Sequence, residues 1–421
     1  MIKKAPWLLG LMFFLAISLL FIACNGDNEA EQNGTEPIAP HEAAIGQIDN
    51  PTDVVRLGFI APITGADAAE GIAARNAFML AVDLANELTE LPFTIEAVPF
   101  DSQSSPRIAL MGVERLLADE TVVAVAGFLH AEAAAAAIPQ FIEHEVPLII
   151  WGATADQLTK YEYRPWILRT IPSITQEVAY LSSFVVDGLE QDSWFLFADS
   201  GLYGESALAA FKHELAVRYI EPLGYFQVAE GEPDFSIILE QIQASGARAI
   251  FSGADAKLTA LLKAELAEAG MHDILFSATS TIRNDKYLVG VGEFAEGTLI
   301  AMPGLVLAEE QAGRRFLTEY MARNLDEPFA TFTGYAYEAA LVIIAALLDL
   351  DEVTPLTLAE QMLAGEAWGL MGRTTFDENG QTTNAVFHLQ VVQDDRWTIY
   401  EHSEYYSGDR TFGGRTIVDP N

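Results

Sequence analysis

Few residues of this chain have the types and spacing needed for chemistry. Cys24 is the only cysteine in 421 residues, so neither an intramolecular disulfide nor a cluster of thiolate ligands can form. The phosphate-binding loop, the HExxH zinc motif and the GxSxG nucleophile turn are all absent. The histidines show no spacing typical of metal ligands; they are His41, His130, His144, His213, His272, His388 and His402. These absences predict a protein that is not an enzyme and that holds neither a metal nor a cofactor.

One glycine-containing segment, GVGEFA at 290–295, has the outline of a degenerate dinucleotide-binding fingerprint. A true fingerprint opens a helix directly after a strand, and this segment does not. We therefore interpret it as a loop.

The remaining candidates for function are loops that follow predicted strands. In open α/β sheets a ligand binds beyond the carboxyl ends of the strands, and two such sheets would place it between them. The candidate loops are 63–71, 127–132, 151–156, 199–204, 252–257 and 277–282.

The elements that must position these loops alternate between short apolar runs and amphipathic stretches, which is typical of βα units. In the first half the predicted strands are 54–60, 93–100, 122–126 and 146–150, and the predicted helices are 70–88, 106–117 and 131–142. The same alternation then starts again. This repetition predicts an α/β fold of two similar three-layer lobes with parallel-type sheets.

In the second half the predicted helices are 175–189, 203–217, 235–244 and 257–269, and the predicted strands are 193–197, 225–228, 249–251, 274–276 and 298–301. Two more helices, 311–323 and 331–348, are followed by a polar tail rich in strand-forming residues. In that tail the pair Asn379-Gly380 stands between strand-like runs and predicts a hairpin.

Length and charge limit the classes of function. A chain of 421 residues exceeds the usual size of one hydrophobic core, which favours two compact domains. It carries 60 acidic and 23 basic residues, a formal net charge of −37. Nucleic acid is excluded as a partner, because a phosphate-binding surface needs clustered Lys and Arg. We interpret the acidic residues as a solvated surface, with cation binding as the alternative.

The N-terminus resembles an export signal. Two lysines precede an apolar run from Ala5 to Ala23, and the segment ending in Cys24 resembles a bacterial lipobox. We predict a lipoprotein signal peptide at 1–24, with lipid attached to Cys24, and a disordered tether at 25–53. The alternative is an uncleaved anchor helix. Either arrangement predicts an extracytoplasmic protein anchored to the bacterial cell membrane.

Several of the segments after residue 54 resemble the leucine/isoleucine/valine-binding protein family. This family has the type I periplasmic-binding fold and serves ABC transporters. The matching motifs are RLGFIAPITG at 56–65, AVDLAN at 81–86, GAT at 152–154, LT at 158–159, RT at 169–170, YGE at 203–205, DFS at 234–236 and FAEGT at 294–298.

The resemblance implies roles for individual residues. Ala153 and Thr154 align with groups that hold a ligand carboxylate, and Tyr203 aligns with a tyrosine that closes over the ligand. Ala131 stands where the family often has Ser or Thr beside the carboxylate site. Thr279 stands where members that bind amino acids place a carboxylate against the ligand ammonium. The alternative for Thr154 is a helix N-cap, and for Tyr203 a surface helix start.

A buried ammonium without a counter-charge is costly. Because Thr279 is not an acid, either the ligand is not a simple amino acid or another acidic residue pairs with its ammonium. Glu70 and Asp255 are the acids that the loops offer. The alternative for both is an exposed carboxylate at a helix start, favoured by the helix dipole.

These features predict a monomeric solute-binding protein of an ABC importer, which captures a small amino-acid-like or amide-like ligand by hinge closure and presents it to the permease. The first lobe is predicted at 54–171 plus 303–374 and the second at 172–302 plus 375–421, with hinges near Pro172, Met302 and Gly372. A ligand-sensing receptor that signals to a membrane partner is the alternative. A hydrolase that uses Glu70 or Asp255 as a base is a third class.

Overall fold

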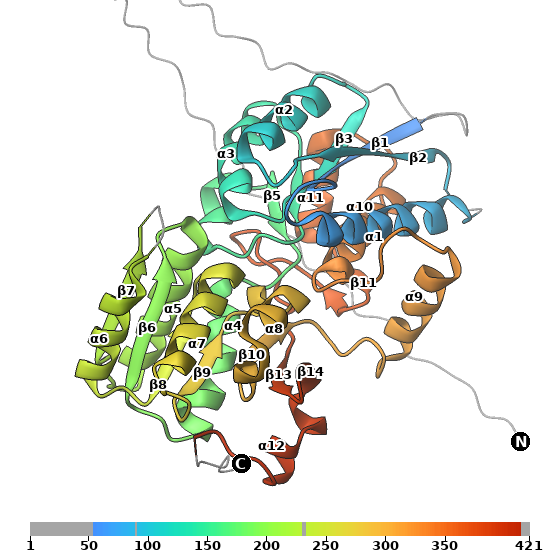
Figure 1. Cartoon of the computed structure of the whole chain (residues 1–421). Helices are drawn as coiled ribbons and strands as arrows, with labels where there is room; N and C mark the ends of the chain where they lie inside the picture. The colour runs from blue at the N-terminus through green and yellow to red at the C-terminus, as the bar shows by residue number, and fades with distance from the viewer. Residues whose placement is uncertain (1–53, 89–90, 230–232, 414–421) are drawn as a thin grey trace, which may run out of the picture. The chain divides into compact units, whose positions relative to one another are not determined.

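A computed structural model of the chain describes residues 54–88, 91–229 and 233–413. The predicted signal peptide, Cys24 and the predicted tether lie outside these residues. Two sheets flanked by helices form most of the described chain (Figure 1). The prediction of an α/β fold with parallel-type sheets is confirmed.

The first sheet has the strand order β2-β1-β3-β4-β5, and all of its neighbouring strands are parallel. Its strands are Val54–Ala61 (β1), Thr94–Asp101 (β2), Val122–Ala126 (β3), Leu148–Ile150 (β4) and Ile167–Arg169 (β5). Strand β1 is buried on both faces, because Leu57 and Phe59 enter one apolar cluster and Ile60 enters the other.

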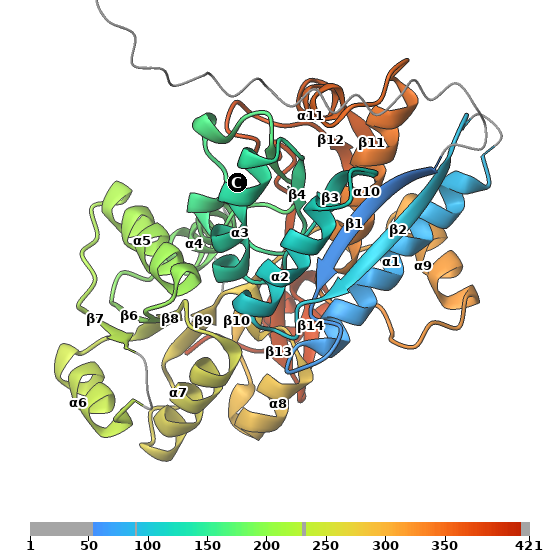
Figure 2. The same cartoon turned by 90° about the horizontal axis from the view of Figure 1, so that it is seen from above.

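Helices cover both faces of the first sheet. Helices α1 and α10 belong to the cluster on one face, and α2 and α3 belong to the cluster on the other (Figure 2). The helices that pack on this sheet are Ala68–Asn86 (α1), Pro106–Leu117 (α2), Ala131–Glu143 (α3), Gln311–Ala322 (α9), Thr333–Leu348 (α10) and Pro355–Ala364 (α11). Helix α2 begins where the sequence predicts, because the Ser105 hydroxyl accepts a hydrogen bond from the Ile108 amide and Pro106 occupies the first turn.

The second sheet has the strand order β14-β13-β10-β9-β8-β6-β7. The strands from β10 to β7 are parallel, whereas β13 and β14 are antiparallel to their neighbours. The strands are Trp194–Asp199 (β6), Gly224–Val228 (β7), Ala249–Ser252 (β8), Leu275–Ala278 (β9), Leu299–Pro303 (β10), Phe387–Gln393 (β13) and Arg396–Ile399 (β14). A separate antiparallel pair is formed by Ala367–Gly369 (β11) and Gly372–Thr374 (β12).

Helices α4 and α5 pack in the cluster on one face of the second sheet, and α6, α7 and α8 pack in the cluster on the other. The helices are Ile174–Ser182 (α4), Leu202–Val217 (α5), Phe235–Ser245 (α6), Ala256–Glu268 (α7), Asp285–Val291 (α8) and Glu404–Ser407 (α12). Helix α4 continues as a π-helical turn, Ser183–Gly188. The predicted helix at 175–189 is thus two segments of different helical type.

Two local predictions need correction. The pair Asn379-Gly380 lies in a turn closed by a hydrogen bond from the Gly380 amide to the Asp377 carbonyl, but the flanking residues form one isolated bridge instead of paired strands. The regular hairpins of the tail are β11–β12 and β13–β14, and the second turns at Asp394 and Asp395 with φ values of 53° and 60°. The prediction of a loop at 290–295 is wrong, since its first two residues end α8 and Gly292–Ala295 form a 3-10 helix.

Candidate ligand-binding site

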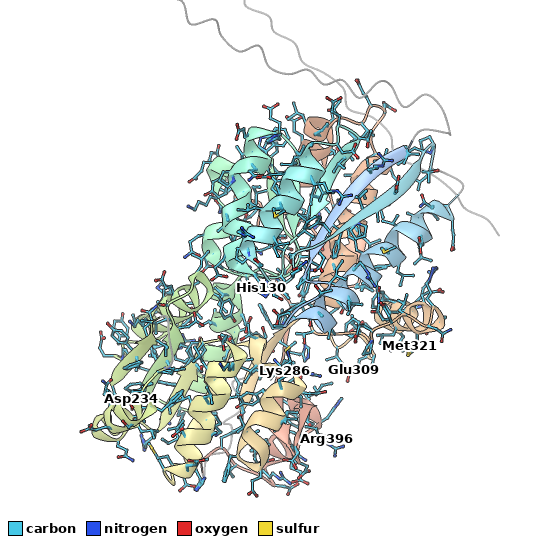
Figure 3. All side chains as sticks on the ribbon, turned by 45° about the horizontal axis from the view of Figure 1, so that its top comes forward. His130, Asp234, Lys286, Glu309, Met321 and Arg396 are labelled. Atoms are coloured by element: carbon cyan, nitrogen blue, oxygen red, sulfur yellow. The ribbon has the colours of Figure 1, made fainter. Side chains whose placement is uncertain are left out.

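Loops that follow strands of one sheet contact loops that follow strands of the other. The Leu202 amide donates a hydrogen bond to the Glu132 carboxylate (3.1 Å), and the Lys286 amine donates one to the Ala66 carbonyl (2.8 Å). Lys286 lies in α8, and Ala66 lies just before α1 (Figure 3). The side chains around these contacts are the ones that a ligand bound by both sheets would meet.

On the first sheet, the residues predicted to hold a carboxylate follow β4. Thr154 is 5% exposed, and among the described residues its hydroxyl has no hydrogen-bond partner. Thr154 is not the N-cap of any described helix, which excludes the alternative role as a helix N-cap. The Ala153 amide is already used, because it donates to the Phe128 carbonyl (2.9 Å). Ala131 is buried and begins α3, so it contributes a helix N-terminus without a hydroxyl.

On the second sheet, Tyr203 lies in the first turn of α5 and Thr279 follows β9. The Tyr203 hydroxyl is buried and has no hydrogen-bond partner of acceptable geometry in the described part of the chain. Burial raises the pKa of Tyr203 well above its usual value, and the charge of Glu177 raises it further. The hydroxyls of Thr279 and Thr281 form a hydrogen bond with each other (3.0 Å). Both lie close enough to Tyr203 to lower its pKa, which offsets part of the rise.

The structure adds an acid that the sequence reasoning missed. Glu177 lies in the first turn of α4, is 2% exposed and accepts hydrogen bonds from the Ser280 amide (2.6 Å) and the Ser280 hydroxyl (3.0 Å). No described Lys, Arg or His forms an ion pair with it. Burial raises the pKa of Glu177 to about 7, although both hydrogen bonds from Ser280 lower it. A buried carboxylate is thus held beside Thr279, where the family resemblance implies an acid.

A sequence signal for Glu177 existed. Ile174, Val178 and Leu181 recur at helical spacing and are fully buried, and Glu177 falls on the same face. An acid in the apolar stripe of a helix that begins at a crossing between two sheets is the pattern that would have identified it.

Besides Tyr203, four buried side chains have a polar atom without a partner within the described residues, namely Trp151, Arg323, Tyr335 and Trp397. Trp151 follows β4 and stacks on Phe59 at 5.7 Å between ring centroids. Tyr335 lies in the first turn of α10, and after burial the charges of Glu338 and Glu177 raise its pKa further. Unpaired polar atoms are rare in protein interiors, so the Tyr203 and Tyr335 hydroxyls, which both feel the charge of Glu177, are typical of a site completed by a ligand or by water.

The two acids predicted from the loops are engaged in other contacts. The Glu70 carboxylate accepts hydrogen bonds from the amides of Thr331 (3.2 Å) and Phe332 (2.6 Å). Asp255 is exposed and caps α7, because its carboxylate accepts a hydrogen bond from the Leu258 amide (2.8 Å). The structure therefore brings Tyr203 and Thr279 together with Glu177, whereas Glu70 and Asp255 bind backbone amides.

We expect Glu70 to make the protein less stable as the pH rises from about 4.5 to about 7. Burial raises the pKa of this carboxyl from 4.5 to about 7, so across that window the folded state binds more protons than the unfolded state. Glu70→Gln should reduce the fall in unfolding free energy, measured by urea titration at pH 5, 6, 7 and 8. Part of the fall should remain, because Glu177 titrates in the same window. Glu360→Gln, at an exposed acid on α11, is the control, and an equal reduction there would contradict the assignment to Glu70.

Neither a metal site nor a membrane span is found in the described residues. In 54–413, apart from the two short gaps, no group of three or more His, Cys, Asp and Glu side chains is arranged to hold a metal ion. None of the helices described there combines the length and the apolar character needed to cross a bilayer.

Comparison with known proteins identifies the family. The model of the periplasmic binding protein family matches residues 54–396. The Leu/Ile/Val-binding protein homolog 3 of Brucella melitensis is 24% identical over 294 residues, which cover 70% of this chain and 78% of that protein. The amino acid binding protein of Pseudomonas aeruginosa is 23% identical over 333 residues, which cover 78% and 87%.

Solved structures share the fold. The leucine-binding protein LivK of Thermotoga maritima superposes with a TM-score of 0.72 at 20% identity, over 82% of this chain and 97% of that one. LivJ of Streptococcus pneumoniae, solved with isoleucine, gives 0.71 at 19% identity, over 87% and 100%. These matches confirm the type I periplasmic-binding fold predicted from the sequence. The chain belongs to the periplasmic binding protein family, whose members are extracytoplasmic solute-binding proteins and not enzymes.

Proposed function

We propose that this protein is the solute-binding component of an ABC importer and that it binds a small amino-acid-like ligand between its two lobes. The lobes are 54–171 plus 303–374 and 172–302 plus 375–421, except that residues 376–382 pack against β5 of the first lobe. The observation that carries the proposal is the buried carboxylate of Glu177, which pairs with no cation among the described residues, beside the Tyr203 hydroxyl, which has no partner there. An ammonium group would supply the missing charge.

The relatives support an amino acid as the ligand class. The curated relatives are described as Leu/Ile/Val-binding or amino-acid-binding proteins. The fold neighbours include one solved with isoleucine and one solved with 3,4-dihydroxybenzoic acid. A carboxylate is common to both of those ligands, and an ammonium is not, so the acid at Glu177 is what favours an amino acid here.

Recognition follows from the side chains. The Thr154 hydroxyl donates to the ligand carboxylate, and the Tyr203 hydroxyl faces the ligand from the second lobe. Glu177 pairs with the ammonium, and binding lowers its pKa because an opposite charge favours the ionised carboxylate. Among the candidate acids Glu177 fits this role best, since Glu70 binds two backbone amides and Asp255 caps a helix.

Ligand capture proceeds by closure of the lobes about the segments that join them. The chain crosses after β5, after β10 and after β12. Pro172 lies in the first crossing, whereas Met302 lies in β10 and Gly372 in β12. The hinges therefore fall in the irregular residues next to these two strands. The closed monomer then presents the ligand to the permease, while lipid on Cys24 and the 25–53 tether keep it at the membrane.

A thermal-shift panel on the purified protein tests the function. We expect L-leucine, L-isoleucine or another amino acid to raise the melting temperature, because a ligand that binds only the folded state at 100 times its Kd contributes about 2.7 kcal/mol. The panel also holds short amides, urea, 4-hydroxybenzoate and 4-methylpentanoate, which is leucine without its amine. We expect 4-methylpentanoate not to displace L-leucine in a calorimetric competition. If no amino acid in the panel raised the melting temperature, the proposal would be wrong.

Tyr203→Phe should stabilise the free protein by about 1 kcal/mol and weaken amino acid binding about tenfold. A buried hydroxyl without a partner costs free energy in the folded state, and the same hydroxyl contributes a hydrogen bond once a ligand is present. Urea unfolding and calorimetric titration measure the two effects.

Tyr287→Phe is the matched control for the stability effect. Tyr287 is fully buried and its hydroxyl bonds to the Thr298 hydroxyl (2.9 Å), so its removal should destabilise the protein. A loss of stability in Tyr203→Phe equal to that in Tyr287→Phe would show that the Tyr203 hydroxyl has a partner in the free protein.

A further inference from the structure

A cavity separate from the candidate ligand-binding site lies at the opposite ends of the second sheet's strands from Thr279. A cavity of about 330 Å³ lies where β9 and β10 begin, between the end of α7 and the tail after β14. Small-molecule sites in proteins have volumes of about 300–1,000 Å³. Thr154, Glu177, Tyr203 and Thr279 are not among the residues that line this cavity.

Lys263 is the residue of this cavity that needs explanation. It lies on α7, is 8% exposed and lines the cavity. Its amine lies 4.9 Å from the centroid of the Phe276 ring, and no described acid forms an ion pair with it. Burial lowers the pKa of this amine to about 8. Among the described residues this buried amine has no carboxylate partner, and a buried charge without a partner is costly.

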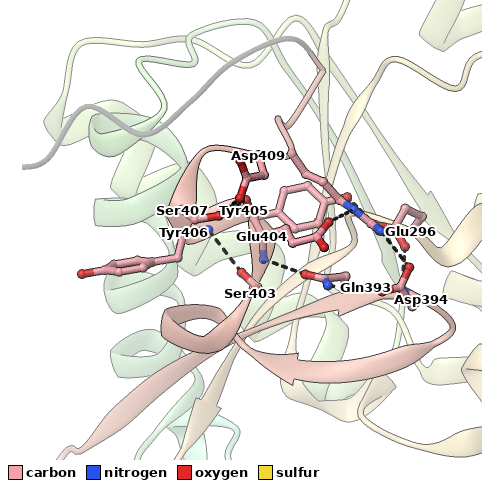
Figure 4. A network of polar contacts seen from close by, with 10 residues as sticks. Glu296, Gln393, Asp394, Ser403, Glu404, Tyr405, Tyr406, Ser407 and Asp409 are labelled. Carbon is pink, nitrogen blue, oxygen red and sulfur yellow. Dashed lines mark hydrogen bonds and ion pairs between the residues drawn. The ribbon is translucent and has the colours of Figure 1, made fainter.

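The tail that forms one wall is fixed by a network of charges (Figure 4). Glu296 accepts hydrogen bonds from the Tyr405 hydroxyl (2.7 Å) and from Arg410 (2.6 Å). Arg410 also pairs with Asp394 (2.7 Å) and Glu404 (2.7 Å). Glu296 is therefore held by Arg410 and Tyr405, and it forms no ion pair with Lys263.

The floor and the rim of the cavity differ in character. Leu266, Leu275, Tyr405 and Phe412 are buried and give the floor an apolar, partly aromatic surface. The rim carries exposed groups, namely His272, Asp273, Glu293 and Phe294. The two exposed carboxylates at the rim repel ligands of high negative charge. A ligand with one anionic group that reaches the floor is attracted by the Lys263 amine.

We infer that this cavity is a second binding site, which takes a small monocarboxylic acid with an apolar body and pairs its carboxylate with the Lys263 amine. The apolar body packs on the floor beside Phe412, and the bound anion supplies a counter-charge that no described residue supplies. The site is independent of the ligand proposed between the lobes.

Benzoate is the probe, and the Lys263 Cε resonance of ¹³C-lysine-labelled protein is the readout. The resonance is assigned by its absence from Lys263→Met. We expect it to titrate near pH 8 in the free protein and about one pH unit or more higher with saturating benzoate, because an anion favours the charged amine. The other ionisable groups that line the cavity are His272, Asp273, Glu293, Glu296 and Tyr405. Benzamide, which has the same ring without the charge, should leave the midpoint unchanged.

Two variants separate this cavity from the site between the lobes. Thr154→Ala should keep the shift caused by benzoate. Lys212→Met should keep it too, because Lys212 also lies over an aromatic ring, that of Tyr225 at 3.3 Å, but does not line this cavity. The inference is overturned if benzoate leaves the Lys263 midpoint unchanged, if benzamide shifts it equally, or if Thr154→Ala abolishes the shift.

Discussion

Glu177→Gln should weaken the binding of an amino acid about 100-fold while leaving the free protein at least as stable at pH 8. Removing one partner of a buried, hydrogen-bonded charge pair costs about 2–5 kcal/mol of binding free energy. In the free protein the effect is opposite in sign. The pKa of Glu177 is raised to about 7, so the ionised acid destabilises the fold above that pH, and glutamine removes this cost. Calorimetric titration with L-leucine or L-isoleucine, together with urea unfolding, measures both effects.

Glu70→Gln and Asp255→Asn complete the comparison, because all three acids are candidates for the ammonium. Glu70 and Asp255 bind backbone amides, so we expect their amide variants to keep the affinity within about threefold. A large loss in Glu70→Gln with none in Glu177→Gln would assign the ammonium to Glu70. Displacement of leucine by an equal concentration of 4-methylpentanoate in the wild type would remove the ammonium from the site altogether.

Gly380→Ala should destabilise the protein by about 3 kcal/mol or more. Gly380 has a φ of +80°, and a Cβ built there would lie 2.2 Å from the Ile167 carbonyl oxygen. The variant therefore combines a backbone conformation that L-residues disfavour with a collision against β5. The Gly380 carbonyl accepts a hydrogen bond from the Arg169 amide (2.8 Å), so a shift of the turn would also break this contact. Urea unfolding measures the loss.

Gly246→Ala is the matched control. Gly246 ends α6 with a φ of +70°, and a Cβ there would meet nothing within 4 Å. We expect a loss of about 1 kcal/mol, which reports the backbone term alone. If both variants lost the same stability, the collision with Ile167 would be absent and the turn would lie farther from β5.

Strong local signals explain most of what the sequence predicted of the fold. Helix α2 was predicted with its observed ends, because Ser105 and Pro106 mark its start and an amphipathic pattern runs to Leu117. Helix α8 was not predicted, since seven residues give too short a pattern. The hairpin β13–β14 was missed because Asp394 and Asp395 adopt positive φ, which asparagine and glycine signal more clearly than aspartate.

The candidate site was predictable only in part. The strand-end rule pointed to the loops of Thr154, Tyr203 and Thr279, and the structure puts Tyr203 next to Thr279. Glu177 was missed because a helix face near a crossing is outside the strand-end loops. Its contact with Ser280 joins residues 103 positions apart, and no pattern within either segment encodes such a distance. Likewise, the backbone amides that bind Glu70 come from Thr331 and Phe332, far along the chain.

The core around the first sheet has a consequence for how the protein is made. Its apolar cluster joins β1 and α1 with Leu307, Phe316 and the whole buried face of α10. Until α10 has been synthesised, β1 and α1 have no partner for that face, so this core closes only after most of the chain exists. A newly made chain should therefore stay incompletely folded for most of its synthesis. Such a delay favours passage through a membrane before folding, as an extracytoplasmic protein requires.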